Sequence, residues 1–210
     1  MSVINYDDFA AMWTAATEAI IANEPLLTKL DCATGDGDHG VTMVRTIKAI
    51  KESIDSCASK NIKQAIGDAA WNAMSQDGGS TGPLFGSLLM GMSAGVDSDE
   101  LDVAAVAKMF DEGLKSLAKQ SKAGVGDKTM MDALIPAVEA INNAAAAGSA
   151  IGAALQLGAD AAAAGAESTK DIEARFGRAR NIGERSLGHA DPGATSISFI
   201  FQAFADSVKG

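Results

Sequence analysis

The stretch DVAAVAKMFDEGLKSLAKQ, residues 102–120, has the apolar spacing of an amphipathic α-helix. Its large apolar side chains recur every three or four residues and would share one helix face: Val103, Val106, Phe110, Leu114 and Leu117. Period-two runs of β-branched residues, which favour strands, do not occur in the chain. The sequence therefore predicts an all-α fold.

Seven other segments show helical spacing or helix-start signals. They are a segment at about 6–23, those starting near His39, after Asn61, at Gly82-Pro83 and at Thr129, the Ala-rich stretch from Ser149 to about Ser168, and the segment from Asp191-Pro192. We expect the first helix to stop before Pro25, and Pro136 to kink or end the first turns of the sixth. With no repeat or linker, residues 1–210 are predicted to form one domain of eight antiparallel amphipathic helices.

Composition and charge narrow the class of protein. Hydrophobic residues make up 47% of the 210 residues, and the net charge of -10 argues against direct nucleic-acid binding. No apolar run reaches the roughly 18 residues that a membrane helix needs. The N-terminus shows no secretory signal, and two cysteines form no disulfide framework. We therefore expect a cytoplasmic protein with no membrane partner.

The connections between the predicted helices fall into two groups. Four are long or rich in Gly, Asp, Ser and Thr: 24–38, 75–82, 118–128 and 169–190. In an up-and-down bundle these four lie at the same end, together with four helix N-termini. Free N–H groups and the positive end of the helix dipole suit phosphate there. This grouping predicts one phosphate-binding site at one end of the bundle.

Three carboxylates lie within eight residues, 31–38, of the first of these connections: Asp31, Asp36 and Asp38. Unpaired, they would repel one another, whereas a hard cation such as Mg²⁺ accepts carboxylate and phosphate oxygens together. A solvated acidic turn is the alternative interpretation. A dinucleotide-binding motif at 35–40 is rejected because no strand precedes it. An EF-hand is rejected because Gly40 and Ile47 stand where oxygen ligands are required.

The other three connections also contain phosphate-type residues. Residues 77–83 form a glycine-rich loop with Ser80 and Thr81 before a helix, although a flexible turn would look the same. Residues 124–129 imitate a P-loop, but Asp127 separates glycine from lysine and no strand precedes them. Residues 177–193 carry arginines that could clamp phosphates, dock a partner or lie in a solvated linker.

Taken in order, these motifs resemble those of the L subunit, or L domain, of dihydroxyacetone kinases. The family patterns appear here as GDGDHG at 35–40, GGSTGPLFG at 78–86, GDKTM at 126–130 and GERSLGHADPGATS at 183–196. The ordered set extends over residues 31–196, and the length of the chain is that of a separate L subunit. The resemblance implies a barrel of eight antiparallel helices with a nucleotide site at one rim.

The resemblance also implies the site residues. Asp31, Asp36 and Asp38 would hold a pair of Mg²⁺ ions on the phosphates of ADP or ATP. The remaining residues would surround the nucleotide: His39, Gly40, Val41, Thr42, Ser80, Thr81, Ser121, Met130, Arg178, Asp191, Pro192 and Gly193.

Partners and mechanism follow from the same resemblance. A separate K subunit would hold the triose covalently, and this chain would form a homodimer or a hetero-complex that is active only with its partners. In one scheme, bound ADP is rephosphorylated by a phosphotransferase-system protein, and in the other ATP binds and exchanges. The alternatives are a nucleotide-sensing module that regulates a transcription factor and a magnesium phosphohydrolase.

Overall fold

Helices account for nearly all regular structure in the computed structural model, which describes residues 2–77 and 79–208. Within these residues the α-helices are α1 (Tyr6–Ala22), α2 (Glu24–Thr34), α3 (His39–Asp55), α4 (Ile62–Met74), α5 (Thr81–Gly95), α6 (Val103–Gln120), α7 (Met131–Ala146), α8 (Ile151–Ser168) and α9 (Pro192–Ser207). Two 3-10 helices, η1 (Thr169–Asp171) and η2 (Ala179–Ser186), lie between α8 and α9. The all-α prediction is confirmed.

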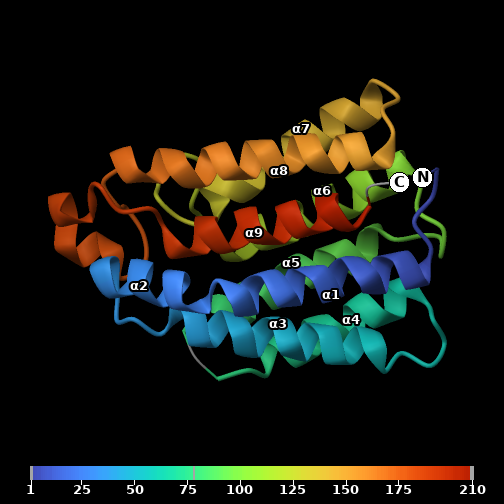
Figure 1. Ribbon diagram of the computed structural model, residues 1–210, viewed down its shortest axis with the longest axis horizontal. Coiled ribbons are helices and arrows are strands. Elements are labelled where there is room, and N and C mark those ends of the chain that lie inside the picture. The colour runs from blue at the N-terminus through green and yellow to red at the C-terminus, as the bar shows by residue number, and fades with distance from the viewer. Residues whose placement is uncertain (1, 78, 209–210) are drawn as a thin grey trace.

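Eight of the helices form a closed ring. In the order α1, α3, α4, α5, α6, α7, α8, α9, each helix packs against the next, and α9 packs against α1. Figure 1 shows them running along the long axis of the molecule, with both termini at one end and α2 at the other. The predicted barrel of eight antiparallel helices is therefore present. No helix among the described residues is long and apolar enough to cross a membrane.

Four helices begin at capping side chains that the sequence supplies locally. Asn5, Asn61, Asp102 and Asp191 each accept a hydrogen bond from the backbone amide three residues further on. Such a cap contributes about 1 kcal/mol to helix stability. Asp191 caps α9, which begins at the same end of the barrel as α2.

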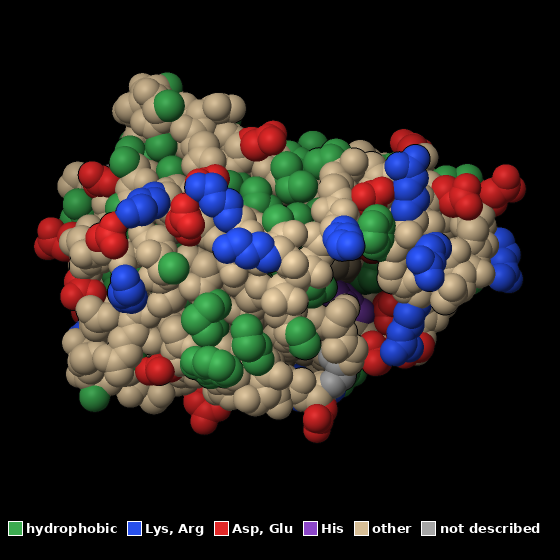
Figure 2. Space-filling view, turned by 180° about the vertical axis from the view of Figure 1, so that it is seen from behind, with side chains coloured by type: hydrophobic (Ala, Val, Ile, Leu, Met, Phe, Trp, Pro, Cys, Tyr) green, Lys and Arg blue, Asp and Glu red, His purple; other side chains and the backbone are tan. Residues whose placement is uncertain are grey.

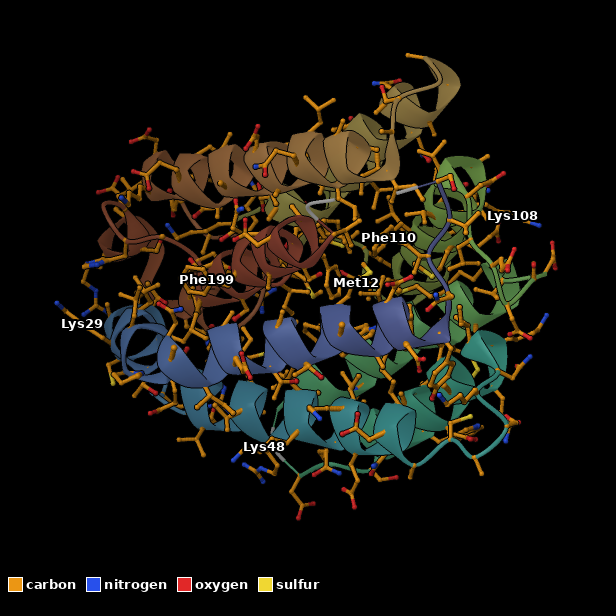
Figure 3. The ribbon with its side chains drawn as sticks, turned by 45° about the vertical axis from the view of Figure 1, so that its right-hand side comes forward. Met12, Lys29, Lys48, Lys108, Phe110 and Phe199 are labelled. Atoms are coloured by element: carbon orange, nitrogen blue, oxygen red, sulfur yellow. The ribbon has the colours of Figure 1, made fainter. Side chains whose placement is uncertain are left out.

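The barrel interior is filled by aliphatic side chains and a group of aromatic rings. Trp13 of α1 packs edge-on against Phe204 of α9 with centroids 5.1 Å apart, and Phe110 of α6 lies 5.2 Å from Phe201. One cluster of buried hydrophobic residues includes members of all nine described α-helices. In Figure 3, Met12 and Phe110 point between the helices, whereas Lys29, Lys48 and Lys108 extend outward.

Helix α2 corrects the predicted connection at 24–38. Pro25 was expected to lie in a connection after the first helix, but it occupies the first turn of a new helix. A proline is tolerated there because the N–H that it lacks would have no partner within the helix. Asn23 separates the two helices and donates its side-chain amide to the Ala19 carbonyl. Asp31 therefore lies on a helix, and the loop between α2 and α3 is short.

Two further expectations need correction. Of the kink or end expected at Pro136, the end is wrong, because the proline lies inside α7, which continues to Ala146; the kink stays a prediction. Pro136 cannot donate to the Asp132 carbonyl, and Gly165 of α8 packs directly against that oxygen. The predicted connection at 169–190 contains η1 and η2; we call residues 169–191, which join α8 to α9, the rim segment.

Candidate functional site

A cavity of about 390 Å³ opens at the end of the barrel that holds α2. Its lining comes from five parts of the chain: the end of α2 with the α2–α3 loop and the first residue of α3, the start of α5 with the loop before it, the α6–α7 connection, the rim segment and the start of α9. Asp36, Ser80, Lys128 and Asp191 all line it, which confirms that the four predicted connections converge. Figure 2 shows a hollow at this end, bordered by histidine, acidic and basic side chains.

The three predicted metal aspartates come together at this cavity. Carboxylate oxygens of Asp31, Asp36 and Asp38 lie within 4.8 Å of one another. The Asp31 Oδ2 atom accepts hydrogen bonds from the amides of Asp38 (2.9 Å) and His39 (3.1 Å), which leaves Oδ1 available. A set of three carboxylates with one oxygen fixed in this way fits a hard divalent cation such as Mg²⁺.

Gly40, Val41 and Thr42 do not line the cavity and form the first turn of α3. A Cβ atom at Gly40 would collide with the Glu24 carbonyl and with Thr28 of α2, so this glycine allows the two helices to pack closely. Val41 is 54% exposed, and Thr42 is buried. The Thr42 amide already donates to the Asp38 carbonyl at 3.0 Å, so the amides of residues 40 and 41 are the ones for which phosphate binding at this helix N-terminus remains a prediction.

His39 lines the cavity and connects α3 to α9. Its Nε2 lies 2.8 Å from Ser196 Oγ, and that hydroxyl donates to the Pro192 carbonyl. In the neutral ring, this arrangement places the proton on Nε2 and leaves Nδ1 unprotonated. Burial lowers the pKa of His39, partly offset by the nearby Asp31 carboxylate, which favours the neutral ring.

The glycine-rich loop leads directly into α5. Ser80 is the N-cap residue, Thr81 begins the helix, and both line the cavity. Gly82 lies against the Ala73 carbonyl of α4, where a Cβ atom would come within 2.7 Å. Gly78, the first glycine of the family pattern, lies outside the described residues. Hydroxyls and free amides thus face the cavity from this side.

The opposite wall consists of Ser121, Met130 and the residues Asp191, Pro192 and Gly193, all of which line the cavity. Gly193 packs against Met130, where a Cβ atom would lie 3.4 Å from the Met130 Cβ. Asp191 Oδ2 accepts from the Ala194 amide at 2.7 Å. Burial raises the pKa of Asp191 to about 7, an effect that its backbone hydrogen bonds oppose.

Arg178 is the predicted site residue that the rim segment contributes. Its guanidinium forms an ion pair with Asp36, across the mouth of the cavity. The other rim arginines are exposed, and Arg175 lies 3.6 Å from Asp127. Arg178 is therefore the rim arginine that lines the cavity and contacts the carboxylate cluster.

Sequence reasoning missed two groups of cavity residues. Leu84, Phe85, Ala123 and Phe176 give the cavity an apolar part. Lys128, which belonged to a rejected P-loop interpretation, is 1% exposed and also contributes to the wall. The family pattern at 126–130 includes Lys128 and so indicated a place near the site, but no local pattern in the sequence indicated that its side chain is buried.

The family model for the DAK2 domain matches residues 33–206. The chain therefore belongs to the DAK2 domain family. Among curated relatives, it is 36% identical over 202 residues to the ADP-binding subunit DhaL of PEP-dependent dihydroxyacetone kinase 1 from Listeria innocua, covering 95% of this chain and 96% of that protein. The corresponding DhaL from Escherichia coli is 35% identical, with 87% and 88% covered.

Solved structures agree with this assignment. The dihydroxyacetone kinase of C. freundii superposes with a TM-score of 0.73 at 26% identity, over 94% of this chain and 34% of that longer chain. The same protein has been solved with AMP-PNP and Mg²⁺, and superposes equally well. The expected family and its helical fold are thus confirmed.

Proposed function

We propose that this chain is the nucleotide-binding, phosphoryl-donating subunit of a dihydroxyacetone kinase. In this proposal Mg²⁺–ADP is a resident cofactor that a phosphotransferase-system protein rephosphorylates, and the phosphoryl group passes to dihydroxyacetone held on a separate K subunit. The observation that carries the proposal is the convergence of three carboxylates, helix N-termini and Arg178 on one cavity. Relatives of matching length named as ADP-binding DhaL subunits support it.

The residues of the cavity suit phosphoryl transfer by positioning and charge compensation. Asp31, Asp36 and Asp38 would hold the Mg²⁺ ions, and two ions are expected. When bound, such ions neutralise phosphate charge and align the reacting oxygens. The first residues of α3, α5 and α9 (His39, Thr81 and Pro192) line the cavity, so the positive ends of three helix dipoles lie beside the proposed phosphate site before the ligand arrives. Arg178 can add a charge-assisted hydrogen bond to a phosphate oxygen.

The choice of ADP as cofactor rests on the relatives' names. The Lactococcus lactis relative is called a PTS-dependent kinase subunit, and the chain is 31% identical to it over 191 residues. A second candidate is ATP binding and exchange, which the related structure with AMP-PNP and Mg²⁺ favours. Some relatives named as kinases without a subunit label are much longer, since the chain covers only 35% of D-erythrulose kinase from Mycolicibacterium smegmatis.

One experiment separates the two schemes. The protein is purified in Mg²⁺ and denatured, and the released nucleotide is quantified by chromatography. One equivalent of ADP is expected for the cofactor scheme, whereas loss of nucleotide during purification and turnover with added ATP would favour exchange.

A second experiment tests whether the chain needs partners. No useful phosphorylation of dihydroxyacetone is expected from the isolated chain with Mg²⁺ and nucleotide. Adding a K subunit, with a phosphotransferase-system donor if the nucleotide is ADP, should restore it. Rapid triose phosphate formation by this chain with ATP alone would refute the proposal.

A further inference from the structure

Lys128 is a buried cation to which the proposed function assigns no role. It lies in the connection between α6 and α7 and is 1% exposed, although lysine is almost never fully buried without a partner. Its φ of 59° is in the left-handed region, which is unfavourable for a residue with a side chain. The fold therefore places a strained, buried lysine beside the cavity.

The Lys128 ammonium connects the two ends of the rim segment. Nζ donates to the Thr169 carbonyl at 2.5 Å and to the His189 carbonyl at 2.6 Å. Thr169 directly follows α8, and His189 lies just before Asp191, the N-cap of α9. The Lys128 side chain thus links the first residue of the rim segment to a residue near its end, and Arg178 lies between them; we call this link the closure.

Other hydrogen bonds reinforce the same closure. The Asp191 amide donates to Thr169 Oγ1 at 2.8 Å, and the Gly188 amide donates to the Lys170 carbonyl at 2.8 Å. These bonds join the beginning of the rim segment, residues 169–170, to its end, residues 188–191. Lys128 joins this closure from a third element, the α6–α7 connection, whose Asp127 carbonyl also accepts from the Arg175 amide at 3.2 Å further along the rim segment.

The charge of Lys128 is compensated without a direct carboxylate bond. Burial lowers its pKa, whereas nearby Asp191 and Asp132 act in the opposite direction. Both oxygens of Asp132 are occupied by backbone amides, with Gly126 at 2.6 Å and Thr129 at 2.7 Å. The ammonium is therefore left to the two carbonyls of the rim segment. Without it, the Thr169 carbonyl would keep only the longer bond from the Ile172 amide (3.3 Å), and the contact with the His189 carbonyl would be lost.

We infer that Lys128 is a positioning residue that fixes the rim segment, and with it Arg178 and the start of α9, against the cavity. This inference rests on the proposed function for the identity of the ligand, a nucleotide phosphate. Lys128 acts through Arg178 and the residues 191–193 and need not touch the nucleotide. Its loss should weaken nucleotide binding more than the reaction that follows at saturation.

The closure can be tested without any ligand by limited trypsin digestion. The rim segment contains four exposed arginines, at 175, 178, 180 and 185, and Arg45 on α3 is an exposed reference site. Lys128→Met keeps the length of the side chain but removes the donors, so cleavage at the rim arginines should accelerate about tenfold relative to Arg45. Lys122→Met, at an exposed lysine of the same connection, removes one tryptic site but should leave cleavage at the rim arginines, relative to Arg45, as in the unaltered protein. Equal rim cleavage in K128M and K122M would overturn the inference.

The consequence for the ligand is tested in the protein reconstituted with its partner subunits. For K128M stripped of nucleotide, the Mg²⁺–ADP concentration that half-restores activity should rise about tenfold, with turnover at saturation nearly retained. A merely structural role would lower turnover through a smaller folded fraction and leave that concentration unchanged, which would count against positioning. Failure of the unaltered protein to bind ADP would refute the proposed function, while the digestion would still decide the closure.

A second variant covers the case in which K128M does not fold. Thr169→Val removes the hydroxyl that accepts the Asp191 amide and leaves Lys128 in place. Selective acceleration at the rim arginines, smaller than for K128M, is expected from T169V. Unchanged rim cleavage in a folded T169V would contradict the closure.

Discussion

Arg178 and Asp36 form an ion pair that joins the rim segment to the carboxylate cluster across the mouth of the cavity. Both side chains are more than a third exposed, so the pair itself contributes little to folding. In the proposed function each partner has another task, since Asp36 would bind a cation and Arg178 a phosphate. The pair therefore keeps both groups at the mouth before a ligand arrives.

The first prediction concerns Arg178. Replacing it by Met should leave the thermal midpoint nearly unchanged but weaken Mg²⁺–ADP binding by about tenfold or more, since a charge-assisted hydrogen bond to phosphate is lost. Isothermal titration and thermal denaturation measure the two effects. Arg180→Met, at an exposed arginine of the same segment, is the control and should change neither. Equal ADP affinity in R178M and R180M would remove Arg178 from the site.

The second prediction separates the stability of the carboxylate cluster from its function. Asp38→Asn should leave the ligand-free protein equally stable or slightly more stable, because repulsion among three neighbouring carboxylates falls. Saturating Mg²⁺–ADP should stabilise the unaltered protein by about 3 kcal/mol at a hundred times the dissociation constant. D38N should lose most of that gain, whereas Asp68→Asn on an exposed face of α4 should keep it. A full ligand-induced shift in D38N would refute the metal assignment.

The third prediction uses two glycines with opposite surroundings. Gly40→Ala places a methyl group against the α2 backbone and should destabilise the protein by about 1–3 kcal/mol. Gly67→Ala meets only Ser93 Oγ, at 3.5 Å, and should stabilise the protein by about 0.5–1 kcal/mol through helix propensity. Urea unfolding measures both. Because α2 carries Asp31, we also expect weaker Mg²⁺–ADP binding in G40A; a G40A protein as stable as G67A would contradict the packing argument.

The fourth prediction concerns the pH dependence of stability. The pKa of Asp191 is raised to about 7 by burial, whereas an Asp in the unfolded chain titrates near 4. Between these values the folded protein retains a proton that the unfolded chain has released. The contribution of Asp191 to the free energy of unfolding therefore falls as pH rises toward 7, by an amount on the order of a few kcal/mol.

Asp191→Asn tests this contribution. Asparagine still accepts the α9 capping bond but does not titrate, so the slope of unfolding free energy against pH should become flatter below pH 7. Urea titrations of both proteins at several pH values give the two slopes. An unchanged slope in D191N would exclude Asp191 as its source.

The local signals in the sequence account for most of the barrel. Spacings such as Val106–Phe110 and caps such as Asn61 lie within one or two helical turns, so they predicted eight helices. The grouping of connections then predicted which end of the barrel holds the cavity. Helix α2 was missed because a proline just after a helix and a proline in the first turn of a new helix give the same local pattern; α1 ends at Ala22, and Pro25 lies in the first turn of α2.

The contacts inside the site depend on distant parts of the chain. His39 meets Ser196, Lys128 meets Thr169 and His189, and Arg178 meets Asp36 only after the ring of helices has closed. No periodicity or cap records such pairs. Gly40 illustrates the same limit, since its family motif indicates a phosphate site while its contacts show a helix-packing role.

Ser2 and Val208 lie at the end of the barrel opposite the cavity, near the N-termini of α6 and α8 (Figure 1). A further domain fused at either of these ends would leave the entrance sterically clear. For such a domain to deliver a substrate to the cavity of its own chain, the linker between them would have to run back along the barrel. The helices there are 16 to 18 residues long, which is a distance of about 25 Å. A short linker therefore favours delivery between neighbouring molecules, and a long one permits delivery within a single chain.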